Sequence, residues 1–242
     1  MIDFESTEAR KAILNSIREH LVASSRLDAV HNEISAASDH LSHPEKRASA
    51  SLEKDLDRSL VDLFKTNLEA VDGQCIIAEG EAAVVQALTG ILTGLQNTGA
   101  SGLRVALSDA PLLGPLAKQL EAYADEIAIA PDASDLFAFD VGISSAQAAI
   151  AETGTLVLRS DRERHRLVSL LPPVHIAIIE ANQLCLTLGE ALAALQRDGK
   201  DLSPAITFIT GPSRTADIEL TLAIGVHGPQ KLFVIINTGA AL

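Results

Sequence analysis

The sequence predicts an α/β fold: three layers around a mostly parallel sheet, with an antiparallel insertion and with N-terminal helices in front. Three features predict it. After Gly73, short apolar runs alternate with segments of helical period, as in strands joined by crossover helices. The apolar runs are unbroken, which is typical of strands buried on both faces. Within Thr155–Ile179, two extended stretches flank a charged turn, which indicates antiparallel pairing.

Residues 1–72 are interpreted as an N-terminal helical extension and residues 73–242 as the α/β domain. Apolar residues recur at helical spacing over 7–21 and again over 52–71. The second pattern stops at Asp72-Gly73, a typical C-terminal cap of a helix. Between the two patterns, residues 31–51 are rich in Ser, His and Ala and have no period, so they are predicted to form a mobile linker.

The elements of the α/β domain follow from the spacing of its apolar residues. Strands are expected at 75–78, 103–107, 127–130, 156–158, 205–209 and 231–237, and helices at 81–95, 112–123 and 186–195. Residues 137–151 form a longer apolar run, and 220–226 fit a helix or a strand equally well. No GxGxxG follows the first strand and no GxxxxGKS occurs in the chain, which disfavours direct binding of NAD or ATP.

The composition disfavours several classes of function. The chain has a formal net charge of −13, whereas nucleic acids and anionic membranes bind basic surfaces. Cys75 and Cys185 lie far apart, so this chain alone cannot supply a zinc or iron–sulfur ligand set. The irregular spacing of His31, His40 and His43 does not suggest a metal site either, and none is expected. An acidic N-terminus and the lack of a membrane-length apolar run predict a cytoplasmic protein.

The most distinctive stretch is 208–219, where an apolar run gives way to Gly, Pro, hydroxyl and charged residues. It is interpreted as a buried strand that turns into the start of a helix, with Ser213 as the N-cap. Free amides after Gly211, the helix dipole, Arg214 and the hydroxyl of Thr215 would then form a binding site for a carboxylate or a phosphate.

Other residues could carry chemistry. Glu152 lies beside Gly154 in a small-residue turn, where a carboxylate can act as a base or a nucleophile, with Thr153 and Gly154 as further contacts to an anion. His227 lies in a Gly- and Pro-containing loop in which the backbone can approach a ligand closely. The arginines within 159–166 could recognise an anionic substrate or an acidic partner, although charged turns are commonly only solvated.

Each candidate also has a purely structural interpretation. Arg214 would pair with Asp217 or Glu219 in a capped helix that binds nothing. Glu152 would accept backbone hydrogen bonds in a tight turn. A histidine that begins an apolar strand, as His175 does, is more often a core residue with satisfied hydrogen bonds than a catalyst.

Four motifs in one order closely resemble the LUD-domain family, in its lactate-utilisation branch. They lie at 151–155 (AETGT), 169–176 (SLLPPVHI), 211–219 (GPSRTADIE) and 225–229 (GVHGP). The resemblance covers about 73–237 and implies a fold like that of the ribose-phosphate isomerase, glucosamine-phosphate deaminase and CoA-transferase group. It also implies participation in the bacterial oxidation of L-lactate to pyruvate alongside two iron–sulfur partner proteins, so that this chain itself carries no cofactor. Leu220 departs from the pattern, because a small residue is expected there.

The working hypothesis is that Ser213, Arg214 and Thr215 bind a small carboxylate, with Glu152 or His227 placed for proton transfer at the hydroxyl-bearing carbon. A second hypothesis uses Glu152 as the nucleophile of a CoA transferase or as the base of a sugar-phosphate isomerase, by analogy of fold. A third makes the chain a non-catalytic assembly or sensing subunit whose N-terminal helices dock on partners.

Overall fold

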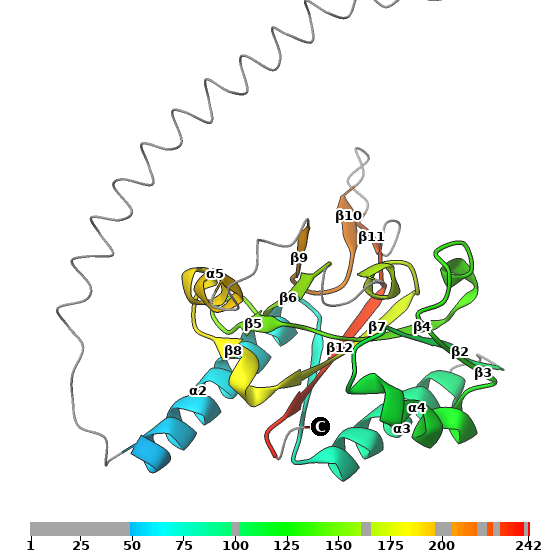
Figure 1. The fold of residues 1–242 in the computed structure, drawn as a ribbon. Coiled ribbons are helices and arrows are strands. Elements are labelled where there is room, and N and C mark those ends of the chain that lie inside the picture. The colour runs from blue at the N-terminus through cyan, green and yellow to red at the C-terminus, as the bar shows by residue number, and fades with distance from the viewer. Residues whose placement is uncertain are drawn as a thin grey trace, which may run out of the picture. The chain divides into compact units, whose positions relative to one another are not determined.

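The computed structural model describes residues 49–97, 102–160, 166–196, 205–216, 222–224, 228–239 and 242, shown as ribbons in Figure 1. The chain divides into two units, 1–50 and 51–242, of which the second holds nearly all of the described residues. The helix predicted over 7–21 and nearly all of the linker predicted over 31–51 lie outside the described residues. Helix α2 (Ser49–Ala70) belongs mainly to the second unit, so the division falls earlier than the predicted boundary after residue 72.

The second unit is built on a six-stranded sheet in which every neighbouring pair is parallel. Its order is β1 (Gln74–Ala78), β12 (Lys231–Asn237), β7 (Val174–Glu180), β4 (Val141–Ser145), β2 (Arg104–Leu107) and β3 (Glu126–Ile129). The central strands are buried on both faces, which is why they are unbroken apolar runs in the sequence. The predicted parallel sheet is confirmed.

One face of this sheet is covered by helices α3 (Glu81–Asn97) and α4 (Leu113–Leu120), which lie below the sheet in Figure 1. Buried side chains of both helices, such as Leu88 and Leu116, form one core with Ile143 and Ile176 of the sheet. Both helices were predicted. The second ends as a 3₁₀ turn at Glu121–Tyr123.

The other face packs against α2 and a four-stranded sheet. That sheet has the order β8 (Leu184–Cys185), β5 (Ala148–Ile150), β6 (Thr155–Arg159) and β9 (Ile206–Ile209). Phe64 and Leu68 of α2 share a core with Leu156 of β6 and Val234 of β12, and helix α5 (Leu188–Gln196) covers the outer face of the small sheet. The layers are therefore α3 and α4, the parallel sheet, and α2 with the small sheet.

The antiparallel insertion exists, but its predicted strands were partly wrong. Strand β6 pairs antiparallel with β5 and β9 and not with the stretch that follows the charged turn. Residues Arg166–Ser169 form a 3₁₀ turn, and β7 enters the centre of the parallel sheet. In the parallel sheet β7 pairs with β12 and β4 along its two edges, and its side chains enter the cores on both faces, which fits its unbroken apolar sequence.

Strand β9 and the segment after it also differ from the prediction. Strand β9 pairs only with β6 among the described strands, and Phe208 is 46% exposed, so the strand is not buried. The segment after its turn is not a helix: strand β10 (Arg214–Ala216) pairs antiparallel with β11 (Leu222–Ile224). The segment 220–226, left open between helix and strand, thus contains a strand.

Helix α2 ends as predicted at Asp72-Gly73, although the residue with positive φ is Asp72 (φ 63) and not Gly73. The amides of Asp72 and Gly73 donate to the carbonyl oxygens of Glu69 and Leu68, at 3.1 and 3.0 Å, which satisfies the end of the helix. Among the described residues, no helix combines the length and the apolar character needed to cross a membrane.

Candidate functional site

A cavity of about 180 Å³ lies where the first residues of β7 and β12 meet the turn after β9. We call it the His175 cavity. It is lined by residues before and at the start of β7 (Ser169, Leu170, His175), by β9 and its turn (Thr207, Phe208, Ile209, Thr210, Gly211, Ser213), and by Gly228, Pro229 and Leu232. Two of the residues predicted to bind an anion, Gly211 and Ser213, are therefore in its wall.

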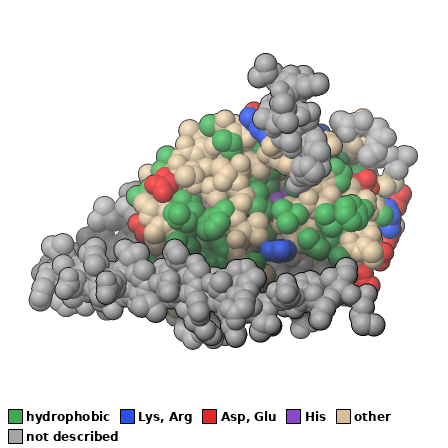
Figure 2. All heavy atoms as spheres, turned by 90° about the horizontal axis from the view of Figure 1, so that it is seen from above, with side chains coloured by type: hydrophobic (Ala, Val, Ile, Leu, Met, Phe, Trp, Pro, Cys, Tyr) green, Lys and Arg blue, Asp and Glu red, His purple; other side chains and the backbone are tan. Residues whose placement is uncertain are grey.

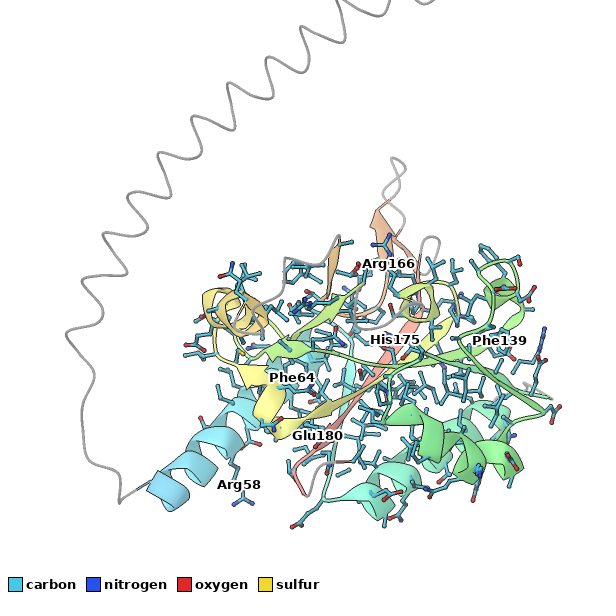
Figure 3. The ribbon with its side chains drawn as sticks, viewed as in Figure 1. Arg58, Phe64, Phe139, Arg166, His175 and Glu180 are labelled. Carbon is cyan, nitrogen blue, oxygen red and sulfur yellow. The ribbon has the colours of Figure 1, made fainter. Side chains whose placement is uncertain are left out.

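His175 is the most unusual of the lining residues. It is fully buried on β7, and its Nε2 lies 2.8 Å from the hydroxyl oxygen of Ser144 on the neighbouring strand β4. Its Nδ1 has no hydrogen-bond partner. Burial lowers the pKa of His175 from 6.5 to about 3, so the ring is neutral at physiological pH. Figure 3 shows His175 near one end of β7, with Glu180 at the other.

A neutral imidazole has one N–H donor and one acceptor nitrogen. If the Ser144 hydroxyl donates to Nε2, then Nδ1 carries the hydrogen and is a donor; if Nε2 donates to the hydroxyl, Nδ1 is an acceptor. A buried polar atom without a partner costs free energy, which a ligand atom placed against it would recover. His175 therefore lines the cavity and has one ring nitrogen whose hydrogen-bonding capacity is unused.

Ser213 does not cap a helix, because strand β10 follows it. Its backbone N–H donates to the carbonyl of Pro229 at 2.8 Å, which holds the turn after β9 against the segment before β12. A Cβ on Gly228 would lie 2.9 Å from the Cβ of Ser213, so this approach requires glycine at 228. Without a helix start, no helix dipole contributes to an anion site here, and that part of the prediction was wrong.

Arg214 pairs with the carboxylate of Asp72, just beyond the end of α2. Its side chain is 40% exposed and it is not among the residues that line the His175 cavity. The pairing partners expected from sequence, Asp217 and Glu219, lie outside the described residues. Thr215 is in β10, and its side chain is likewise not described.

The motifs around Gly154 and Gly211 meet at the last turns of α2. Both glycines have positive φ, 63 and 87, and a Cβ on either would collide with α2 or its end, at 2.4 Å from the Leu68 nitrogen and 2.8 Å from the Val71 oxygen. Asn67 of α2 donates to the carbonyl of Ala151 at 2.8 Å. The two glycines therefore have a structural role, because turns without a Cβ at these positions can lie directly on the backbone of α2 and its end.

A short chain of hydroxyl groups links the two turns. The Thr153 and Thr155 oxygens are 2.7 Å apart, and the Thr155 and Thr210 oxygens are also 2.7 Å apart. Thr210 lines the His175 cavity. The structure thus connects the predicted residue Thr153 to the cavity wall through Thr155, although Thr153 and Gly154 are not themselves among the described lining residues.

Glu152 lies elsewhere. Its carboxylate accepts a hydrogen bond of 3.3 Å from the backbone N–H of Leu188, the first residue of α5, and its own N–H donates to Leu186. A carboxylate at the N-terminal end of a helix is favourable to that helix. Glu152 is not among the described residues that line the His175 cavity, and His227 lies outside the described part of the chain.

Ser144 is a functional candidate that the sequence did not single out, and His175 is one for which the sequence favoured a structural role. His175 was interpreted as a core residue with satisfied hydrogen bonds; it is buried, but one of its nitrogens is unsatisfied. The signal was the placement of a histidine in an apolar strand after Pro172-Pro173. Its serine partner lies 31 positions earlier in the sequence, in a run of small residues, and only the sheet pairing brings the two together.

The described residues contain no group of three or more His, Cys, Asp and Glu that could hold a metal. Cys75 is buried, which raises the pKa of its thiol to about 12, so the thiolate is not formed at neutral pH. A four-thiolate iron–sulfur site needs more cysteines than the two in the whole sequence.

In the view from above, the acidic side chains that are visible on the described surface lie toward its edges, and hydrophobic side chains form patches on it (Figure 2).

Comparisons with known proteins identify relatives. The chain is 35% identical over 156 residues to the uncharacterised protein NMB1437 of Neisseria meningitidis serogroup B, covering 64% of each chain. It is 42% identical over 111 residues to lactate utilization protein C of an Exiguobacterium species, and 38% identical over 100 residues to that of Bacillus licheniformis; these matches cover 44% and 40% of this chain and 48% and 42% of the relatives. The matches thus span less than two thirds of the length of these relatives.

A crystal structure of a DUF162 family protein from Deinococcus radiodurans aligns with a TM-score of 0.51 at 19% identity, covering 74% of this chain and 97% of that one, and it supports the fold. A family model of the LUD domain matches residues 61–236, which hold α2 from Val61 onward, the strands of all three described sheets apart from the last residue of β12, and every described residue of the His175 cavity. Because this match covers well over half of the sequence, the chain belongs to the LUD domain family.

Proposed function

We propose that this protein takes part in bacterial lactate utilisation, in the oxidation of L-lactate to pyruvate, and that it binds a small carboxylate in the His175 cavity. Membership of the LUD domain family and the similarity to proteins named lactate utilization protein C support the metabolic role. One structural observation carries the binding proposal: a buried histidine with an unpaired nitrogen lines a small cavity that also contains Gly211 and Ser213.

The size and lining of the cavity suit a three-carbon hydroxy acid. Its volume of about 180 Å³ is below the range of pockets for drug-sized ligands, which begins at about 300 Å³. Lactate presents a hydroxyl group and a carboxylate on adjacent carbons. In the proposed pose the hydroxyl of lactate lies against Nδ1 of His175, and its carboxylate accepts a hydrogen bond from the side-chain hydroxyl of Ser213.

The roles expected of Arg214 and Thr215 in binding the carboxylate stay proposals, and Arg214 is not among the described residues that line the His175 cavity. Arg214 follows the cavity-lining Ser213 directly, and a guanidinium has five N–H donors, so it can keep Asp72 and also bind a ligand carboxylate. Because Asp72 partly offsets the charge of Arg214, the orientation of the acid would depend strongly on the neutral donors of the cavity. Thr153 and Gly154 support the site through the hydroxyl chain to Thr210 and the packing on α2.

Oxidation of lactate to pyruvate removes two electrons and two protons, one from the hydroxyl and one from the adjacent carbon. The iron–sulfur clusters would be held by the partner proteins and would accept the electrons. His175, as a neutral ring, is a candidate to orientate the hydroxyl through a hydrogen bond. Because burial lowers its pKa to about 3, the ring is a weak base, and the hydroxyl proton would pass to another group. The proton-transfer roles expected of Glu152 and His227 remain proposals, and no described contact brings Glu152 to the cavity.

Two measurements test this proposal. The melting temperature of the full chain should rise with L-lactate or pyruvate, because a ligand that binds only the folded state stabilises it by about 2.7 kcal/mol at a hundredfold excess over Kd. Arg214→Ala should abolish lactate-dependent reduction in a mixture with the iron–sulfur partner proteins, and Arg58→Ala, at an exposed site on α2, should not. Full activity of the Arg214 variant would contradict the role of this residue.

The alternatives predict different results. A non-catalytic sensing or assembly subunit would bind lactate, yet the mixture would oxidise lactate equally well with the wild type and with variants that no longer bind it. A CoA-transferase-like enzyme would form a thioester on Glu152 with an acyl-CoA, and an isomerase would act on a sugar phosphate without partner proteins. The contacts of Glu152 at the start of α5 do not favour either enzyme.

A further inference from the structure

The connections of the parallel sheet change direction between β2 and β4, which are neighbours in the sheet. After β2 the chain enters α4, which packs on the face covered by α3. After β4 the chain enters β5, whose Ala149 packs in the core on the opposite face. In open α/β sheets, a crevice forms outside the carboxyl ends of two such strands, and ligands bind there.

A second cavity, of about 520 Å³, lies at this point. We call it the switch-point cavity. Its wall contains Ala110 and Pro111 after β2, Ser145 and Gln147 at the end of β4, Arg159 at the end of β6 and Leu195 on α5. It shares no described lining residue with the His175 cavity. Its volume lies in the range of about 300–1,000 Å³ that is typical of sites for organic ligands and cofactors.

Arg159 is a buried cationic residue in the wall of this cavity. The residue is only 3% exposed, in contrast to the solvated turn expected from sequence. Its Nη1 donates to the carbonyl of Leu195 at 3.0 Å, and its backbone N–H donates to the Gln147 side chain at 2.6 Å. These contacts hold the side chain against the cavity wall. A guanidinium stays charged at any physiological pH, and its attraction for an anion is stronger in a site that excludes water.

We propose that the switch-point cavity binds an organic anion larger than lactate, with its phosphate or carboxylate group against Arg159 and its apolar part against Pro111 and Leu195. The cavity lies at the position that the sheet topology favours for ligands, has the volume for a mononucleotide-sized molecule and contains a buried cation. This proposal does not depend on lactate binding in the His175 cavity.

The test measures binding of four probes to the full chain by thermal shift and calorimetry. AMP carries a phosphate and citrate carries carboxylates, which are the two candidate anionic groups. Adenosine is AMP without its charged group, and inorganic phosphate is the charged group without the nucleoside. AMP or citrate should bind, and adenosine should not. Whichever of the two binds identifies the anionic group. If inorganic phosphate alone binds, or if no probe binds at millimolar concentration, the proposal is overturned.

Two variants with matched controls locate the binding. Ala194→Phe inserts a ring into the cavity from α5, and Ala193→Phe places the same ring at the neighbouring exposed position. Arg159→Gln removes the charge, and Arg58→Gln removes a solvent-exposed one. The first member of each pair should raise the Kd of the bound probe by about tenfold or more, and the second should leave it unchanged.

The Ala194 variant keeps the proposal falsifiable even if loss of the buried Arg159 impairs folding. Equal probe affinity in the Ala193 and Ala194 variants would overturn the proposal. The thermal shift caused by L-lactate should persist in Ala194→Phe. Its loss there would mean that the two cavities do not act separately, which would also contradict the proposal.

Discussion

Replacing both members of the Ser144–His175 pair by apolar residues should stabilise the protein and abolish lactate binding. His175→Phe keeps a flat ring of similar size, and Ser144→Ala removes the hydroxyl that faces it. Wild-type His175 carries a buried nitrogen without a partner, which costs about 1–3 kcal/mol. The double variant removes this cost without creating a new unpaired group, so its free energy of unfolding should rise by about that amount.

The single variants should behave differently. Ser144→Ala leaves both ring nitrogens of His175 without a protein partner and should lower the free energy of unfolding by about 1–3 kcal/mol. His175→Phe exchanges the unpaired nitrogen for an unpaired Ser144 hydroxyl, so the two effects nearly cancel. A double-mutant cycle by urea unfolding therefore gives a coupling energy of about 2–6 kcal/mol, because the double variant gains about as much free energy of unfolding as Ser144→Ala loses.

Ligand binding completes this test, because lactate should raise the melting temperature of the wild type and of neither His175 variant. Ser213→Ala, at a residue that lines the same cavity, should reduce the rise in melting temperature that lactate causes. This substitution leaves the unpaired nitrogen of His175 unchanged. The reasoning is refuted if the double variant is no more stable than the wild type. It is refuted equally if the double variant shows the wild-type response to lactate.

The remaining predictions concern the rest of the same domain. Between pH 6.5 and about 3 the unfolded chain protonates His175 and the folded chain does not, so this residue's contribution to stability is complete above pH 6.5 and falls by about 1.4 kcal/mol per pH unit as the pH decreases. The free energy of unfolding should therefore fall more steeply with decreasing pH in the wild type than in His175→Phe. The same pH dependence in both proteins would contradict the burial of a neutral ring. Gly154→Ala should lower the free energy of unfolding in urea by about 2 kcal/mol or more, because a Cβ there meets α2 at 2.4 Å and φ is positive. Gly94→Ala, in open space on α3, should raise the free energy of unfolding by about 0.5–1 kcal/mol. Equal effects of the two substitutions would contradict the close approach of Gly154 to α2. Cys75 should resist an aromatic disulfide reagent in the folded protein while the half-buried Cys185 reacts first, and a faster reaction at Cys75 in single-cysteine variants would show that its thiol is not buried.

The sequence was sufficient to predict the elements whose pattern is local. The unbroken apolar runs at β7 and β12 mark strands buried on both faces, and the helical period with Asp72-Gly73 marks the end of α2. These features depend on residues that are near one another in the chain. For the same reason the class of the fold could be inferred, because alternating strands and helices leave few arrangements other than a covered parallel sheet.

The errors concern pairings between distant segments. The turn after β9 contains the residues of a helix start, yet it is held to Pro229 by a hydrogen bond from Ser213, and β10 pairs with β11. A capping residue raises the local preference for a helix by only about 1 kcal/mol, which such contacts outweigh. The partner of β6 likewise depends on which strands need burial on both faces.

The site was predicted in part for the same reason. Gly211 and Ser213 do line a cavity, because small and hydroxyl residues after a strand commonly allow a ligand to approach. His175 and Ser144 could not be paired from sequence, since their contact exists only through the register of β4 and β7. The burial of Arg159 depends on α5, which comes more than 25 residues later in the chain.

A crystal structure of the full chain grown with L-lactate would test the central claim most directly. The account predicts one lactate molecule in the His175 cavity, with its hydroxyl oxygen within hydrogen-bond distance of Nδ1 of His175 and its carboxylate on the side of Ser213. An unoccupied His175 cavity in crystals that hold lactate at another place on the protein would contradict the account.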